Sequence, residues 1–256
     1  MNQGNPNPYE ATPPSAVPVG QLGARPVFRP YVTYILIGIC VGVYLLQLAT
    51  QSLYGIDIPA AWGVKANDLI MQGQLWRIIT PVFLHGSIFH IAFNMYALFY
   101  LGTTLERFYK HWRFLVLFLI SGFAGNVISF MFSNYPSLGA STAIFGLLGA
   151  EGVLLYQNRE IFGNIVRRAL SQVIMIAVVN LIIGLSPGID NWGHIGGLIG
   201  GTMFAWFGGP LFKRQGLFPP YTIEDVRRPR EVIIAGVGVV GLFFFLAIAA
   251  MFLRSG

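Results

Sequence analysis

The chain has 256 residues, of which 55% are hydrophobic and only 10% are charged. A soluble domain of this length needs a far more charged surface, so the composition excludes a soluble protein and indicates an integral membrane protein. The single cysteine, Cys40, excludes a disulfide framework and a cysteine-based metal cluster.

The predicted elements begin after a segment rich in proline, asparagine and glycine, residues 1–30, which we expect to be a flexible cytoplasmic tail without the layout of a cleaved signal peptide. Seven apolar segments follow, and each is near the roughly 20 residues that a helix needs to cross a bilayer. They lie at about 31–50, 84–103, 112–133, 140–157, 169–186, 192–209 and 232–253. Several contain glycine and polar residues, which favours packing inside a bundle. The sequence therefore predicts an all-α polytopic membrane protein.

Two connections divide these segments into groups. Residues 51–83 have mixed polarity, and residues 210–231 carry two prolines and a basic cluster. We therefore expect a six-span core at 31–209, a basic cytoplasmic linker at 210–231, and a seventh transmembrane helix with a short outer end at 232–256.

The basic residues are distributed unevenly between the two sides of the expected membrane. If the N-terminus is cytoplasmic, thirteen of the sixteen Lys and Arg residues lie inside and three lie outside. The outer three are Lys65, Arg77 and Arg254. This bias predicts a cytoplasmic N-terminus and an outer C-terminus. The net charge of +6 is thereby explained by membrane orientation, and a nucleic-acid partner loses its support.

This topology places polar residues from three separate spans at a similar depth. His85, His90 and Asn94 fall near the outer end of the second span, Ser141 at the start of the fourth, and His194 at the start of the sixth. His90 and Asn94 are one helical turn apart and share a face. Chance can place one polar group there, but it accounts poorly for the whole set.

The sixth span has the glycines needed for a close helix contact. Residues 193–201 contain three overlapping pairs of small residues at four-residue spacing, and the fourth span has Gly146 and Ala150 at the same spacing. Such a glycine face is by itself usually structural. Here it carries His194 at its outer end, and close packing against the span with Ser141 would bring Nε2 within hydrogen-bond reach of Oγ.

In combination these stretches resemble the rhomboid intramembrane serine proteases. The similarity runs from about Tyr31 to Gly209 in the right order, and the matching stretches are Trp76-Arg77, His85 to Asn94, Leu101 to Glu106, Gly139 to Ser141 and His194 to Gly201. The resemblance implies a six-helix catalytic core and a serine endopeptidase that cleaves transmembrane proteins near the outer leaflet. It implies single-span substrates with helix-breaking residues and a small side chain at the cut, and neither metal nor cofactor.

The resemblance also assigns roles to individual residues. Ser141 would be the nucleophile and His194 its general base and then general acid, as a dyad because no carboxylate is available nearby. Phe145 occupies the position of an aromatic residue that packs against the catalytic imidazole. Glu106 and Arg107 match a cytoplasmic structural motif.

His90 and Asn94 match the residues that stabilise the tetrahedral oxyanion together with the backbone N–H of Ser141, and His85 matches a less defined position on the oxyanion side. Two positions depart from the family pattern. Thr142 stands where the family usually has glycine, which we expect to tune substrate choice or rate, and Gly193 stands where it prefers alanine.

Other interpretations remain for the same residues. A lone serine in a membrane helix usually donates a hydrogen bond to the carbonyl four residues earlier. His90 and Asn94 could form hydrogen bonds between helices instead of a site. Glu151 lies about 15 Å along the helix from Ser141 and is interpreted as a hydrogen-bonded structural group, with a proton-handling role as the alternative. A catalytically inactive relative that binds membrane helices stays open, as does a transporter or channel, although no internal repeat is evident.

Two further protease chemistries are excluded by the residues present. A metalloprotease needs two histidines one turn apart with a glutamate, but His85 and His90 are five apart. An aspartyl protease needs aspartates within spans, whereas all four aspartates lie in connections. The physiological substrate, the oligomeric state and the organism class stay open, and a bacterial cytoplasmic membrane is favoured because no sorting presequence is evident.

Overall fold

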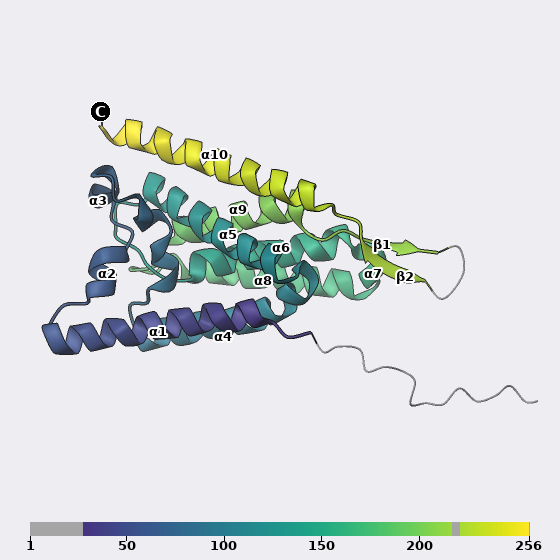
Figure 1. The fold of residues 1–256 in the computed structure, drawn as a ribbon, viewed down its shortest axis with the longest axis horizontal. Helices are drawn as coiled ribbons and strands as arrows, with labels where there is room; N and C mark the ends of the chain where they lie inside the picture. The colour runs from purple at the N-terminus through teal and green to yellow at the C-terminus, as the bar shows by residue number, and fades with distance from the viewer. Residues whose placement is uncertain (1–27, 217–220, 256) are drawn as a thin grey trace, which may run out of the picture.

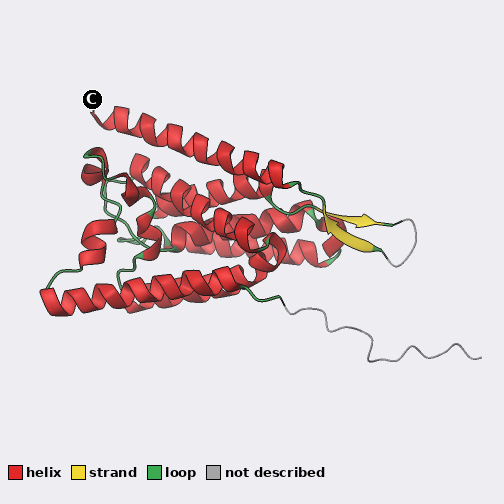
Figure 2. Cartoon of the chain, in the orientation of Figure 1, coloured by secondary structure: helices red, strands yellow, loops and turns green. Residues whose placement is uncertain are grey.

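The computed structural model describes residues 28–216 and 221–255, and these fold into a helical bundle with one small hairpin (Figures 1 and 2). The long helices are α1 (Tyr31–Tyr54), α4 (Ile88–Tyr109), α5 (His111–Phe132), α6 (Ser141–Gln157), α8 (Ile165–Ile183), α9 (Asn191–Gly208) and α10 (Pro229–Ser255). The short ones are α2 (Ile58–Gly63), α3 (Asn67–Met71), α7 (Arg159–Phe162) and the 3-10 turns η2 (Leu75–Ile78) and η3 (Thr80–Phe83). Strands β1 (Phe212–Gln215) and β2 (Thr222–Asp225) pair antiparallel.

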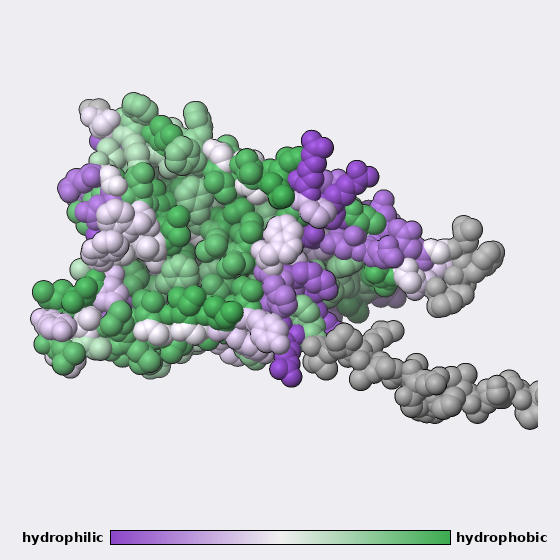
Figure 3. All heavy atoms as spheres, viewed as in Figure 1, coloured by the Kyte–Doolittle hydropathy of each residue, from purple (hydrophilic) through white to green (hydrophobic). Residues whose placement is uncertain are grey.

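Within the described residues, five helices are long and apolar enough to cross a membrane, namely α1, α4, α5, α8 and α10. Apolar side chains cover the body of the bundle, whereas hydrophilic ones gather most densely where the hairpin leaves it (Figure 3). The expected all-α polytopic membrane protein is therefore confirmed. We call the two ends of the bundle the hairpin end and the α2–α3 end, after the elements found there in Figure 1.

Helices α6 and α9 lie at the centre and touch through their backbones. A side chain added at Gly197 would place its Cβ 1.9 Å from the carbonyl oxygen of Thr142, and one at Gly201 would come within 2.4 Å of Gly146. Glycine is therefore required at both positions for the two helices to approach this closely. Helix α5 packs on the same pair, since a Cβ at Gly125 would lie 2.6 Å from that of Thr142.

The second span begins later than the sequence predicted. It was expected at about 84–103, but α4 runs from Ile88 to Tyr109. The hydroxyl of Ser87 accepts a hydrogen bond from the N–H of His90 and caps the helix there. His85 consequently lies in the preceding loop rather than at the outer end of the span. The linker expected at 210–231 also contains structure, because the hairpin occupies part of it.

Two basic side chains hold the connection between α1 and α4 in place. Lys65 is fully buried, and its ammonium donates to the carbonyls of Ser129, Ser133 and Tyr135 at the end of α5. Burial lowers the pKa of Lys65 to about 8, partly opposed by the charge of Asp190. Arg77 donates to the carbonyls of Ala61 and Val64 in the α2 region, at 2.8 and 2.9 Å, so it has a structural role in this connection.

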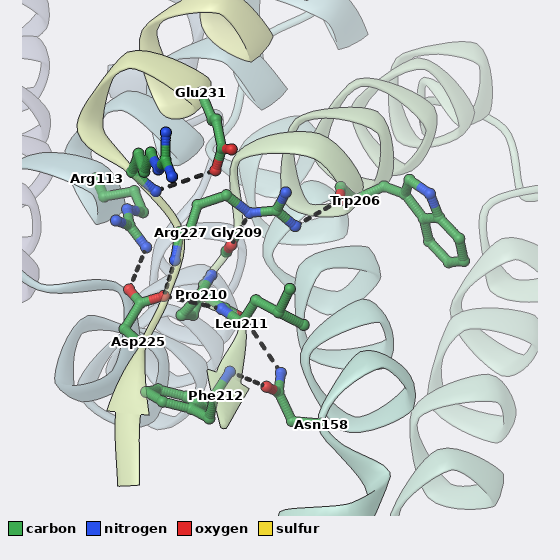
Figure 4. Close-up of polar contacts among 11 residues, drawn as sticks. Arg113, Asn158, Trp206, Gly209, Pro210, Leu211, Phe212, Asp225, Arg227 and Glu231 are labelled. Atoms are coloured by element: carbon green, nitrogen blue, oxygen red, sulfur yellow. Dashed lines mark hydrogen bonds and ion pairs between the residues drawn. The ribbon is translucent and has the colours of Figure 1, made fainter. Parts of the chain in front are cut away.

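A polar cluster at the hairpin end ties α10 to the rest of the bundle (Figure 4). The carboxylate of Asp225 accepts from Arg113 of α5 at 2.8 Å and from the backbone N–H of Leu211 at 3.0 Å. Arg227 donates to the carbonyl of Gly209 at the end of α9, and Asn158 bonds the chain on both sides of Leu211. These bonds fix the linker directly before α10, and α10 itself packs along α5 and α9.

Glu106 of α4 joins the start of α1 to the core. Its buried carboxylate accepts from the N–H groups of Val32 and Thr33, at 2.9 and 2.8 Å, and from the Thr33 hydroxyl at 2.6 Å. The first N–H groups of a helix have no acceptor within the helix. Glu106 therefore caps α1 from a neighbouring helix.

Replacing Glu106 with alanine should lower the free energy of unfolding by about 3 kcal/mol, because the two buried donors of Thr33 and the part-buried N–H of Val32 would lose a charged acceptor. Thermal unfolding in detergent micelles measures the change. Glu224→Ala is the matched control, since that side chain is exposed on β2 and its loss should cost less than about 0.5 kcal/mol. Equal melting temperatures for the two variants would contradict the capping role.

Candidate active site

Ser141 and His194 are 53 residues apart in sequence and adjacent in the fold. Ser141 opens α6, and His194 lies in the first turn of α9. The Ser141 Oγ lies 2.9 Å from His194 Nε2, which is hydrogen-bond distance. A hydroxyl held this close to an imidazole is the arrangement in which a serine can be activated as a nucleophile.

The imidazole of His194 is held by packing as well as by this bond. The ring of Phe145, one turn after Ser141, stacks on it with centroids 4.3 Å apart and planes 13° apart. The Nδ1 atom of His194 is buried and finds no hydrogen-bond partner within the described residues. The carboxylate of Asp190, at the start of the same helix, instead accepts from the N–H of Gly193 and the hydroxyl of Ser129.

A cavity of about 720 Å³ opens beside this pair. Its lining combines the N-terminal parts of α4, α6 and α9, the loop before α6, and the C-terminal part of α8 with the loop after it. Polar lining residues include His90, Asn94, Ser141, Thr142, Asp190 and His194. Four of the expected site residues thus face one cavity together with Thr142.

His90 and Asn94 enter the cavity from α4. The His90 ring lies against Gly139, where an added Cβ would be 2.6 Å from Nε2. Gly139 has a φ of +133°, so both the backbone and the close contact require glycine. The Nδ2 atom of Asn94 is buried and lacks an acceptor within the described part of the chain. A buried amide with a free donor is costly unless something else binds it.

His85 is not among the residues that line the cavity. It is 1% exposed, and its ring meets the edge of His90 with centroids 5.2 Å apart. Burial, together with the nearby His90, lowers the pKa of His85 to about 4, so the ring is neutral at pH 7. His85 therefore packs against the edge of the His90 ring without lining the cavity itself.

Thr142, the residue after Ser141, fits because its neighbours are glycines. A Cβ added at Gly193 would lie 2.9 Å from Thr142 Cγ2 and 3.0 Å from the carboxylate of Asp190. Thr142 is also tight against Gly125 of α5. Thr142 and Gly193, the two positions at which the sequence analysis expected departures from the family pattern, are thus in contact, and the small residue makes room for the larger one.

Sequence reasoning missed Asp190 as part of this region. It was placed in a connection and given no role, yet it caps α9 and lines the cavity. The available signal was an aspartate three residues before Gly193 at the start of an apolar segment, which is typical of a helix N-cap. Asn126 and Asn180 also line the cavity, but each donates to a backbone carbonyl, as expected for structural residues.

Comparison with known proteins gives a consistent result. The family model described as "Rhomboid domain" matches residues 72–211. The chain is 43% identical to "Rhomboid protease GluP" of Bacillus subtilis over 69% of its length. It is 32% identical to "RHOMBOID-like protein 9, chloroplastic" of Arabidopsis thaliana over 72%, and 37% identical to "Rhomboid-like protease 1" of Toxoplasma gondii over 56%. The chain spans only 34%, 43% and 52% of these relatives.

The contact between Thr142 and Gly193 can be tested by a double-mutant cycle. Gly193→Ala should destabilise the protein by about 2 kcal/mol, because its Cβ overpacks the contact. In a Thr142→Ala background the same change should cost about 1 kcal/mol less, since the obstructing Cγ2 is gone. Thermal unfolding in detergent measures all four corners of the cycle.

Gly238→Ala is the control for this cycle, because nothing lies within 4 Å of the added Cβ on α10. It should be neutral or stabilising, since alanine has the higher helix propensity. Additive effects of Gly193→Ala and Thr142→Ala would show that the two positions are independent.

Proposed function

The chain belongs to the rhomboid family, and on that premise we propose that it is an intramembrane serine endopeptidase working through Ser141 and His194. The observation that carries this proposal is the 2.9 Å contact between Ser141 Oγ and His194 Nε2 beside a polar cavity. The curated relative from Bacillus subtilis is itself named a protease.

In the proposed reaction the Ser141 hydroxyl attacks the carbonyl carbon of the scissile peptide bond. His194 Nε2 takes the hydroxyl proton and then gives it to the leaving amine, which breaks the C–N bond and leaves an acyl-serine. A water molecule then attacks the ester carbonyl while the same imidazole takes its proton. The ester C–O bond breaks, the proton passes to Ser141 Oγ, and the new carboxyl end of the substrate is released. Phe145 stacks on one face of the His194 imidazole and so holds the orientation of that ring during these proton transfers.

The negative charge that develops on the carbonyl oxygen needs preorganised donors. We assign this task to the backbone N–H of Ser141, the side chain of His90 and the amide of Asn94. The N–H groups in the first turn of α6 lack intrahelical acceptors. His90 Nδ1 accepts from the N–H of Gly86 at 3.4 Å, which favours the tautomer with a proton on Nε2. The buried, unpaired Nδ2 of Asn94 is available in the same way.

The proposed substrates are transmembrane proteins, which must unwind locally because a helix hides its carbonyls in hydrogen bonds. The cavity lies at the α2–α3 end, which suits hydrolysis with water better than a transport path across the whole membrane. No metal or cofactor has a part in this mechanism.

The proposed orientation puts the hairpin end in the cytoplasm. Most described Lys and Arg residues belong to segments at that end, and only Lys65, Arg77 and Arg254 belong to the opposite one. Since positive loops stay inside, the dyad would lie near the outer leaflet and the C-terminus outside. A bacterial cytoplasmic membrane is the proposed location.

The proposed function predicts that the purified chain cleaves a single-span test substrate in liposomes. Ser141→Ala and His194→Ala should each lower the rate at least about a thousandfold, because neither partner works alone. Ser52→Ala, exposed on α1, is the matched control and should keep the parent rate. Gel analysis of the fragments gives the readout.

Cleavage by Ser141→Ala at the parent rate would rule out the mechanism. A parent chain that cuts none of several substrates would instead favour a catalytically inactive rhomboid that binds membrane helices. The name of the Arabidopsis thaliana relative, "RHOMBOID-like protein 9, chloroplastic", does not include the word protease. An inactive member is therefore the alternative that this outcome would support.

Asn94→Ala should lower kcat about 100-fold with little change in KM, because a donor used only in the transition state is lost. His90→Ala should act in the same direction. Steady-state kinetics on the same substrate measure both constants. Asn164→Ala, exposed at the start of α8, is the control. A rise in KM without loss of kcat would show that Asn94 binds substrate in the ground state instead.

A further inference from the structure

Asp190 joins the helix that carries His194 to its surroundings. It directly precedes α9, its Oδ1 accepts from the N–H of Gly193 at 3.1 Å, and its backbone carbonyl accepts from the N–H of His194 at 3.2 Å. Asp190 therefore accepts hydrogen bonds from two consecutive N–H groups in the first turn of α9, those of Gly193 and His194. It is thus the N-cap of α9, four residues before the proposed base.

The other carboxylate oxygen of Asp190 reaches a different helix. Its Oδ2 accepts from the hydroxyl of Ser129, a fully buried residue of α5. Ser129 Oγ is also 3.5 Å from the hydroxyl of Ser137 in the loop that leads to Ser141. The backbones of Ser137 and Lys65 bond each other in both directions, at 3.0 and 3.1 Å. One carboxylate thus links α9 with α5, and through Ser129 with the loop before α6.

The two linked segments are those that carry the proposed nucleophile and base. Ser137 is four residues before Ser141, and Asp190 is four residues before His194. Movement of either helix start would stretch the contacts that run from Asp190 through Ser129 to Ser137. The carboxylate also touches the position of Gly193, where an added Cβ would come within 3.0 Å of Oδ2.

We propose that Asp190 is a positioning residue that fixes the start of α9 relative to Ser141, and so sets the alignment of His194 with the nucleophile. This inference rests on the proposed function. It differs from a third catalytic residue bonded to the imidazole, because His194 Nδ1 has no partner within the described residues and the Asp190 carboxylate bonds Gly193 and Ser129 instead. The role depends on two hydrogen bonds, and an asparagine can make both, as acceptor to Gly193 and as donor to Ser129.

The test compares three substitutions by steady-state kinetics on a single-span test substrate. Asp190→Ala should lower kcat about 30-fold, because small misalignment of reacting groups is costly. KM should stay within about twofold, since uniform substrate binding is unaffected. Asp190→Asn should return kcat to within about threefold of the parent, because asparagine is an equally good helix cap. Ser129→Ala removes one of the two bonds, and its kcat should fall between those of the parent and Asp190→Ala.

Asp57→Ala is the matched control. Asp57 also caps a helix, with Oδ1 accepting from Ala60 N–H at 2.9 Å, and its other oxygen bonds Gln47 of α1. Its loss should leave kcat within about twofold, because it caps α2 rather than α9. All variants are assayed well below their own melting temperatures, so that a loss of kcat does not report unfolding.

Three results would overturn the inference: parent-like kcat in Asp190→Ala, failure of Asp190→Asn to recover activity, or an equal loss in Asp57→Ala. The second would assign the effect to the charge of Asp190. Failure of the proposed function is recognised separately. In that case the parent chain shows no Ser141-dependent cleavage and no labelling of Ser141 by a fluorophosphonate probe, whatever residue stands at position 190.

Discussion

Backbone contact between α6 and α9 is the constraint on which the rest of the structure depends. Without side chains at Gly197 and Gly201, the two helices approach until carbonyl and Cα atoms of α6 fill the space. Only at that separation can a serine on one helix and a histidine on the other share a hydrogen bond of 2.9 Å. Association in lipid relies on packing and hydrogen bonds because apolar surface gains little by leaving a bilayer. A glycine contact is therefore a direct way to set this distance.

The remaining bonds hold a frame around that contact. Glu106 fastens α1 to α4, and the Asp225 cluster fastens α10 against α5 and α9 at the hairpin end. At the opposite end, polar atoms without partners in the described residues gather near one cavity, among them Asn94 Nδ2 and His194 Nδ1. Unpaired polar groups cost free energy where water is scarce. Most of the buried polar atoms that lack a partner within the described residues lie at the α2–α3 end, and Arg113 Nε at the hairpin end is an exception.

The pair Thr142 and Gly193 shows how the same contact tolerates sequence change. The expectation that a β-branched residue beside Ser141 tunes substrate choice or rate stays a prediction. In the fold the Cγ2 of Thr142 occupies the space that a Cβ at position 193 would need. The larger residue next to Ser141 thus lies against the smallest possible residue next to His194. The two positions share one packing contact across the helix pair.

The sequence by itself determined the membrane class, the number of long helices and the segregation of basic residues, because hydropathy and charge are local properties of each segment. It also pointed to Ser141 and His194, whose roles remain proposals. The tertiary structure decided that His85 lies behind His90, that the linker forms a hairpin, and that Asp190 bonds Ser129 and Gly193. A hydrogen-bond partner tens of residues away depends on how helices approach one another, and no local pattern encodes that distance.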